Sequence, residues 1–193
     1  MRRVQRNEIL DLGAYEQIRE KFRARIIAEK RNRRFDVGDE MSVVFENHDT
    51  VLFQVQEMLR TERIASPPGI AHEIETYNDL IADADELSAT LFVEIPDKET
   101  RDRRLVELCG LERAVSLDIA GTPVPATFDE RSLMPDRTLA VHYLKFALGV
   151  GSVARWEAAR GEVAFVVSHP RLSLRVPLPP AVFAALAEDL ASG

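Results

Sequence analysis

Residues 88–96 read SATLFVEIP, and this stretch decides the fold class. Leu91, Val93 and Ile95 alternate with the residues between them, a period of two that is typical of a β-strand. The segments before this stretch mostly show helical spacing, and those after it mostly show strand spacing. That order favours an α+β fold, with N-terminal helices packed on a largely antiparallel sheet formed mainly by the C-terminal half.

Three helices and one strand are expected before this stretch. The apolar stripe of Tyr15, Ile18, Phe22 and Ile26 predicts a helix from residue 14 to about residue 32, with Gly13 as a break before it. The further segments expected in this half are a strand over 41–46 and helices over 50–64 and 70–81. Residues 65–69 read ASPPG, a strong break and a candidate subdomain boundary within what we expect to be a single domain of residues 1–193.

Strands and short helices are expected to alternate in the second half. Residues 139–148 are apolar on both faces, which predicts a central strand. Pro123 and Pro125 remove backbone donors and favour an edge or bulged strand. The remaining expected elements are helices over 98–108, 152–160 and 180–190 and hairpins over 115–128 and 163–176.

The composition excludes several classes of protein. The chain has 193 residues, is 46% hydrophobic and contains one cysteine, so it should build an ordinary core without a disulfide framework or a CxxC redox pair. Met1-Arg2-Arg3 is followed by Glu8 and not by an apolar region, and no apolar run approaches the length of a membrane span. We therefore expect a cytoplasmic protein with no membrane partner.

Charge is unevenly distributed along the chain. Residues 1–34 hold eleven Lys or Arg and five Asp or Glu, although the whole chain has a net charge of −7. This basic region either docks an acidic protein partner or pairs with the acidic remainder of its own chain. The candidate partner-binding residues on the first predicted helix and just beyond it are Arg19, Arg23, Arg31 and Arg34.

Other partners are less well supported by the sequence. Nucleic acid is disfavoured because the chain is acidic and because Tyr15 and Phe22 lie on the apolar stripe rather than among the basic residues. Edge strands expected near Pro123 and Leu172 would expose unpaired backbone groups, so a homodimer that covers them remains an alternative.

The phosphate-binding, nucleophile-elbow and zinc-protease motifs are absent from the sequence, so no cofactor and no catalytic residue is indicated. The most polar segment runs from Glu46 and Asn47 into the helix that carries Glu57. Glu46 faces the same side of its strand as Val44, which places it partly inside. The sequence favours helix capping for this cluster, and an anion site at the start of the helix is the alternative.

His142 is the histidine with the most informative surroundings. It shares a strand face with Leu144 and Phe146, so it is either a neutral core residue or a ligand or general base beside a carboxylate such as Glu94. A set of carboxylates with one imidazole suits iron or manganese. The candidate polar site therefore comprises Glu46, Asn47, Glu57, Glu94 and His142, and the sequence leaves open whether the protein is an enzyme.

Three stretches resemble a bacterial family of uncharacterised proteins, the domain of unknown function family 3501. They are VFEN (44–47) with TVLFQVQEMLR (50–60), YNDLI (77–81) with LSATLFVEIP (87–96), and VHYLKF (141–146). The likeness extends from Ile9 to the last predicted helix. It implies no activity, cofactor or catalytic residue.

The resemblance does imply a physiological setting. Members of the family tend to be encoded near rubrerythrin-like and iron–sulfur oxidoreductase-like proteins. This implies an accessory role in redox or oxidative-stress physiology, with a redox or iron–sulfur protein as a partner. A carboxylate-rich metal-binding protein or metal-dependent enzyme is the alternative.

Overall fold

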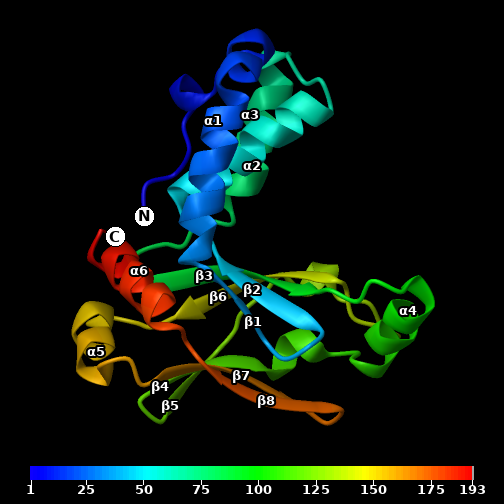
Figure 1. The fold of residues 1–193 in the computed structure, drawn as a ribbon, viewed down its shortest axis with the longest axis vertical. Helices are drawn as coiled ribbons and strands as arrows, with labels where there is room; N and C mark the ends of the chain where they lie inside the picture. Colours follow the sequence, from blue (N-terminus) through cyan, green and yellow to red (C-terminus); the bar gives the residue numbers. More distant parts are fainter. Residues whose placement is uncertain (193) are drawn as a thin grey trace.

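The computed structural model describes residues 1–192, and its elements confirm the α+β class (Figure 1). The helices are α1 (Leu12–Arg31), α2 (His48–Thr61), α3 (Pro67–Asn78), α4 (Lys98–Glu107), α5 (Ser152–Ala159) and α6 (Pro180–Ala191), with short 3-10 turns η1 (Arg6–Glu8), η2 (Leu111–Ala114) and η3 (Glu130–Ser132). The strands are β1 (Arg34–Asp36), β2 (Met41–Phe45), β3 (Glu86–Val93), β4 (Val115–Ile119), β5 (Thr122–Pro125), β6 (Val141–Ala147), β7 (Val163–His169) and β8 (Leu172–Pro177).

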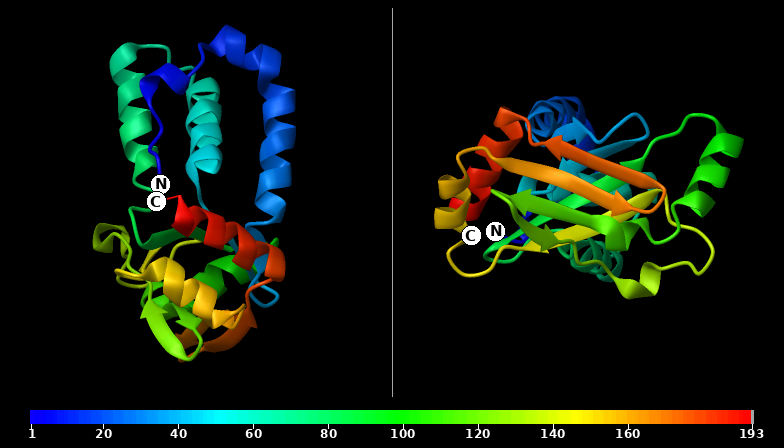
Figure 2. Two further views of the ribbon diagram at one scale, coloured as in Figure 1. Left: turned by 90° about the vertical axis from the view of Figure 1, so that its left-hand side faces the viewer. Right: turned by 90° about the horizontal axis from the view of Figure 1, so that it is seen from below.

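The strands form two antiparallel sheets that pack face to face. Sheet A has the order β1-β2-β3-β6, and sheet B has the order β5-β4-β7-β8. Figure 2 shows the two sheets stacked, with α5 and α6 at one end and α4 at the other. We call the two sheets with α4, α5 and α6 the β body. Most of its strands come from the later half of the chain, as predicted.

Apolar side chains from both sheets fill the space between them. Phe45 and Phe146 of sheet A meet Phe165 of sheet B, with the centroids of Phe146 and Phe165 6.2 Å apart in an edge-to-face arrangement. Trp156 of α5 stacks on Phe183 of α6 at 4.9 Å and donates its indole N–H to the Phe183 carbonyl. Edge-to-face rings add geometric specificity to a large buried apolar area.

The three N-terminal helices form a single layer that stands off the β body (Figures 1 and 2). Together with residues 1–11, we call α1, α2 and α3 the helical arm. The arm has its own smaller apolar cluster, which includes Val51, Val55 and Leu59 of α2. The N-terminal segment lies against α3, where the Asn78 amide accepts from the backbone N–H of Val4 and donates to its carbonyl.

Several details differ from the sequence-based expectations. Gly13 lies inside α1 and not before it, because the helix already begins at Leu12. Its N-cap is Asp11, whose side chain accepts from the Ala14 N–H. Pro67 begins α3, since proline is well tolerated in the first turn of a helix. The break at 65–69 therefore lies inside the arm, between α2 and the first turn of α3.

The strand over residues 139–148 is an edge strand, and the prediction of a central strand was wrong. β6 is the last strand of sheet A, and beyond it lies only a single bridge to Thr127. His142, Leu144 and Phe146 face the core, whereas Val141 and Tyr143 on the other face are exposed. The apolar residues on that second face thus lie on a partly exposed surface and not in a second buried layer.

Candidate functional site

The helical arm meets the outer face of sheet A at a cleft with a volume of about 540 Å³. We call it the junction cleft. Its walls come from the C-terminal end of α3, from strands β3 and β6, and from the segment that follows β5. The side chains that line it include Glu46, Tyr77, Asp79, Ser88, Thr90, Phe128, Asp129, Arg131, Tyr143 and Lys145.

Glu46 lies at the buried side of the junction cleft. Its side chain follows β2 on the outer face of sheet A, and the residue is only 3% exposed, which confirms the prediction that it points inward with Val44. Thr50 and Thr90 each donate a hydroxyl hydrogen bond of 2.6 Å, one to each carboxylate oxygen. Within residues 1–192 no Lys, Arg or His forms an ion pair with it, so two neutral hydroxyls are its side-chain partners.

Two tyrosines line the same cleft, and one of them, Tyr143, lies near the buried carboxylate. Tyr143 neighbours Thr90 across the β3–β6 pair, and burial followed by the negative charge of Glu46 raises the pKa of its phenol. Burial, followed by the nearby Tyr143, also raises the pKa of Tyr77, which comes from α3. Both phenols therefore stay protonated at neutral pH, and the Tyr77 hydroxyl is hydrogen-bonded to Gln54 of α2.

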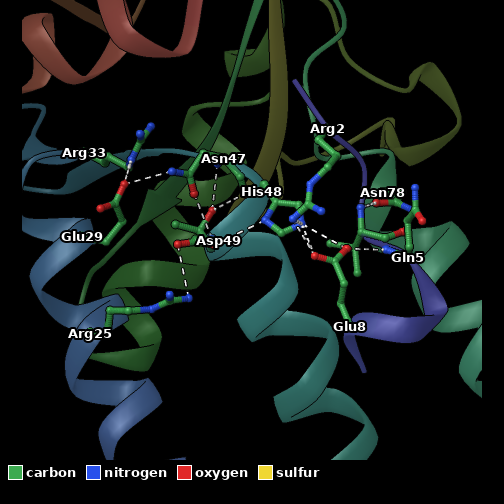
Figure 3. A network of polar contacts seen from close by, with 12 residues as sticks. Arg2, Gln5, Glu8, Arg25, Glu29, Arg33, Asn47, His48, Asp49 and Asn78 are labelled. Atoms are coloured by element: carbon green, nitrogen blue, oxygen red, sulfur yellow. Dashed lines mark hydrogen bonds and ion pairs between the residues drawn. The ribbon is translucent and has the colours of Figure 1, made fainter. Parts of the chain in front are cut away.

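Asn47 caps a helix. Its side-chain oxygen accepts from the Thr50 N–H at 2.9 Å, and its amide donates to Glu29 of α1, which also binds Arg33. The network continues through His48, which contacts Glu8 of the N-terminal segment at 3.1 Å (Figure 3). The capping interpretation of this segment is therefore the one that the structure favours for Asn47.

Glu57 joins α1 and α2. Arg19 donates two hydrogen bonds of 2.8 Å to its two oxygens, and the Tyr15 hydroxyl donates a third of 2.7 Å. The hydrogen bonds from Arg19 are the main cause that lowers the pKa of Glu57, and burial opposes them. Arg60 and Glu16 form a second ion pair between the same two helices.

Glu94 follows β3 at the end of sheet A opposite to Glu46. It accepts a hydrogen bond of 2.6 Å from Ser42 and pairs with Arg34 of β1 at 2.7 Å. These two contacts, Ser42 first, lower the pKa of its carboxyl.

His142 lies on the core face of β6, where its neighbours are different from those proposed from the sequence. The Thr138 hydroxyl lies 3.1 Å from Nε2 and 2.7 Å from Glu112, and Glu112 lies 3.8 Å from Nδ1. Burial lowers the pKa of His142, and Glu112 only partly opposes this. A neutral, buried imidazole agrees with the core interpretation, and the neighbouring carboxylate is Glu112 and not Glu94.

Of the five residues of the candidate polar site, Glu46 and Asn47 share Thr50 as a partner, whereas Glu57, Glu94 and His142 lie in separate contacts, and only Glu46 lines the junction cleft. The described part of the chain, residues 1–192, holds no group of three or more His, Cys, Asp or Glu side chains arranged to hold a metal ion. The structure therefore does not assemble a metal site from Glu46, Glu57, Glu94 and His142.

The four candidate arginines divide into two pairs. Arg19 is bound to Glu57 and Arg34 to Glu94, so these two follow the self-pairing alternative. Arg23 and Arg31 are exposed on α1 and have no ion-pair partner within residues 1–192. The alternative of a docking surface therefore remains for Arg23 and Arg31.

Sequence reasoning missed the residues that give the junction cleft its character. Tyr143 and Lys145 lie on β6, far from Glu46 in the sequence, and the pairing of β2 with β3 and of β3 with β6 brings them to the same cleft, to which α3 adds Tyr77. A usable signal was present, since Ser88 and Thr90 alternate with the apolar residues of β3 and mark its second face as polar. Their burial shows that another element covers that face.

Comparison with known proteins places the whole chain among proteins without an assigned activity. Residues 3–190 match a family described as protein of unknown function, DUF3501. A crystal structure described as a novel protein of unknown function from Burkholderia pseudomallei K96243 is 34% identical, covers 98% of this chain and 100% of its own, and has a TM-score of 0.89. No curated protein matches. None of the helices in residues 1–192 combines the length and the apolar character that crossing a bilayer requires.

Proposed function

Since this chain belongs to the DUF3501 family, whose members are described as proteins of unknown function, we propose its role from its own geometry. We propose that it is a non-catalytic accessory protein that binds an acidic partner protein through α1 of the helical arm. The observation that carries this proposal is the exposure of α1. Of its twenty residues, only Tyr15 and Ile26 are buried.

Apolar side chains contribute to the exposed surface of α1. Ile18 is 42% exposed and Ile27 is 46% exposed, on a helix that packs against α2 and leaves its other sides open (Figure 2). Single exposed apolar residues are ordinary, but a projecting helix that combines them with charge is typical of a docking element. Nine residues apart, the two isoleucines lie on opposite sides of the helix, so a partner docked on one side would bury one of them.

The charge on α1 favours an acidic partner. Its three acidic residues are engaged within the chain, Glu16 with Arg60, Glu20 with Arg19, and Glu29 with Arg33. Its free cations, those without an ion pair in residues 1–192, are Lys21, Arg23, Lys30 and Arg31. Unpaired positive charge of this kind accelerates association with a negatively charged protein and makes the rate depend on salt.

The family resemblance suggests where to look for the partner. An accessory role in redox or oxidative-stress physiology directs the search to acidic redox or iron–sulfur proteins. The alternative of a metal-dependent enzyme has less support, because the carboxylates and the histidine on which it rested are not brought together. A homodimer through α1 is disfavoured by the like charges that it would juxtapose.

Native mass spectrometry tests this proposal. The protein would be purified from its own host at low salt, and co-purifying proteins would be identified by mass. We expect a stoichiometric partner with an acidic isoelectric point. The double variant R23E/R31E should reduce its recovery at least tenfold, and the association rate of the purified pair should fall with ionic strength.

A matched variant controls for the change in net charge. Arg113 and Arg171 are exposed on the β body and have no ion pair within the described residues. The variant R113E/R171E should therefore recover the partner as the wild-type protein does. Equal recovery with R23E/R31E, a basic partner, or the absence of any partner at low salt would contradict the proposal.

A further inference from the structure

The junction cleft holds a buried carboxylate for which residues 1–192 supply no cation. An ionised carboxylate is strongly disfavoured in a protein interior unless a cation or several hydrogen-bond donors compensate it. At 3% exposure, Glu46 receives one hydroxyl hydrogen bond on each oxygen. Each carboxylate oxygen can accept two, so acceptor positions remain available at the cleft.

Both threonine hydroxyls hold the Glu46 side chain in place, one at each oxygen. The Thr50 hydroxyl lies 2.6 Å from Glu46 and 3.0 Å from the Asn47 carbonyl, and its oxygen accepts from the Asn47 backbone N–H. Thr90 has Glu46 as its side-chain partner. The side chain of Glu46 is thus fixed in position at the buried side of the cleft.

The walls of the cleft suit a positively charged group. Tyr77, Tyr143 and Phe128 bring three aromatic rings to the walls of the cleft. A cation is attracted to the face of an aromatic ring, and the attraction grows where water is excluded. A protonated amine between Glu46 and these rings would complete both interactions.

Lys145 provides the opposite charge in the same cleft. The Cα atoms of Ser88 and Lys145 are paired between β3 and β6, and the Glu46 N–H binds the Ser88 carbonyl. Glu46, Ser88 and Lys145 therefore form a row across three strands, and at about 4.8 Å per strand the outer two backbones lie about 10 Å apart. Within residues 1–192 the Lys145 ammonium has no ion pair, whereas Arg131 at the rim is bound to Asp129.

We propose that the junction cleft binds a small zwitterion of the amino-acid class, with its ammonium group at Glu46 and the two tyrosines and its carboxylate at Lys145. An α- or β-amino acid carries its ammonium and its carboxylate one or two carbon atoms apart, and the Glu46 and Lys145 side chains extend from the two ends of this row on the same face of sheet A. A cleft of about 540 Å³ is large enough for such a ligand with its side chain. This site lies apart from the exposed face of α1, so it stands or falls independently of the proposed partner binding.

The proposal is tested first with the wild-type protein. The twenty free L-amino acids would be titrated by isothermal calorimetry at up to about 10 mM, a range that covers millimolar dissociation constants. For the tightest of them, the matching amine without the carboxylate and the matching acid without the amine would follow. We expect the zwitterion to bind at least tenfold more tightly than either truncated compound.

Variants then assign the two ends. Glu46→Gln should weaken binding of the zwitterion at least tenfold, and Lys145→Met should weaken it while leaving the affinity for the truncated amine unchanged. Glu112→Gln is the matched control, because Glu112 is also a buried carboxylate bound to a threonine hydroxyl but lies outside the cleft. Tyr143→Ala, at a half-exposed position, gives a second test in case Glu46→Gln folds poorly, and it should weaken binding severalfold.

Three results would overturn the proposal. They are no heat of binding for any of the amino acids, unchanged affinity in both Glu46→Gln and Tyr143→Ala, and a deaminated acid that binds as tightly as the zwitterion. An amine that binds as tightly as the zwitterion would overturn the assignment of the carboxylate to Lys145.

Discussion

The β body and the helical arm hold their elements together in different ways. In the body, two sheets enclose a continuous apolar core in which Phe45, Phe146 and Phe165 meet. In the arm, α1 buries only Tyr15 and Ile26 and is tied to α2 by ion pairs. The apolar cluster of the arm is correspondingly smaller.

This difference implies different responses to conditions. Apolar burial does not depend on the protonation of side chains, whereas paired charges lose their attraction when a carboxylate is protonated and weaken in salt. We therefore expect the arm to loosen under conditions that leave the body folded. Four predictions test this comparison, from the largest expected effect to the smallest.

Phe146→Ala should have the largest effect, because it opens a cavity where rings from both sheets meet. We expect the free energy of unfolding to fall by about 3–5 kcal/mol. Urea unfolding followed by Trp156 fluorescence measures this, since Trp156 belongs to the same core.

Val55→Ala in the arm is the companion to that variant. It removes buried methyl groups from α2 and should lower the helical circular-dichroism signal at urea concentrations where Trp156 still reports a folded body. If both variants shift both signals together, arm and body unfold as one unit and the comparison fails.

Arg33→Met should have the next largest effect, because Arg33 joins the two regions. It lies just beyond α1, is buried, and binds both Glu29 of α1 and Asp189 of α6. Its removal leaves the carboxylate of Asp189 buried without a cation, at a cost of about 3 kcal/mol. Urea unfolding of the variant would show this loss.

The double variant R33M/D189L distinguishes the loss of the ion pair from the burial of an unpaired charge. Replacing both partners by apolar residues removes the uncompensated carboxylate, so much of the lost stability should return. A double variant less stable than Arg33→Met would show that the ion pair itself, and not the orphaned charge, stabilises the joint.

Acidification should act on the arm through Glu57. Its pKa lies below the ordinary value of 4.5 in the folded protein, mainly through the hydrogen bonds from Arg19, so the unfolded chain binds this proton more readily. The stabilisation is therefore complete above about pH 4.5 and is lost as the pH falls through the lowered pKa. Hydrogen exchange of α1 and α2, corrected for intrinsic rates, should accelerate over this range before that of β4 and β7.

Glu57→Gln provides the control for the acid response. It should cost about 1–2 kcal/mol of arm stability at pH 7, since it removes the charge from three hydrogen bonds at a partly exposed site. It should also flatten the dependence of α1 exchange on pH. An unchanged dependence would assign the acid response to other carboxylates.

Charge reversal on the exposed face of α1 should have the smallest effect on stability. Arg23 and Arg31 form no ion pair within the described residues, so R23E/R31E should change the free energy of unfolding by less than about 0.5 kcal/mol. Urea unfolding would verify this. A larger loss would mean that the basic face supports the fold, which would weaken its assignment to a partner.

Short-range sequence patterns predicted the helices and strands of this protein well, but they did not predict which elements lie next to one another in space. The alternation around Leu91 predicted β3, and the stripe of Tyr15 and Ile26 predicted α1, because burial imposes its period on the sequence. The prediction that Glu46 turns inward is confirmed for the same reason. The strand β1 was missed, since three residues between a helix and a turn carry no measurable period.

The partners of the polar residues were harder to predict, because they depend on strand order. The wrong placement of β6 followed from treating Val141 and Tyr143 as core residues. The sequence suggested Glu94 as the neighbour of His142, but Glu112 occupies that place because the turn η2 packs below β6. The convergence of Glu46 with Tyr143 and Lys145 needs the register of two strand pairs, which no local pattern contains.

The order of strands in sheet A also has a consequence for how the chain folds during its synthesis. β3 pairs with β6, and between them lie α4, β4 and β5, which belong to other layers. Sheet A is therefore incomplete until residue 147 has left the ribosome, and sheet B until residue 177. The contacts that join α1, α2 and α3, such as Arg19 with Glu57 and Val4 with Asn78, all lie within the first 78 residues. The arm can therefore emerge and fold before β6 and sheet B have been synthesised. During that interval the apolar face of β2 and β3, on the side of sheet A away from the arm, would lack sheet B as its cover, and this is the stage at which the protein would most need a chaperone.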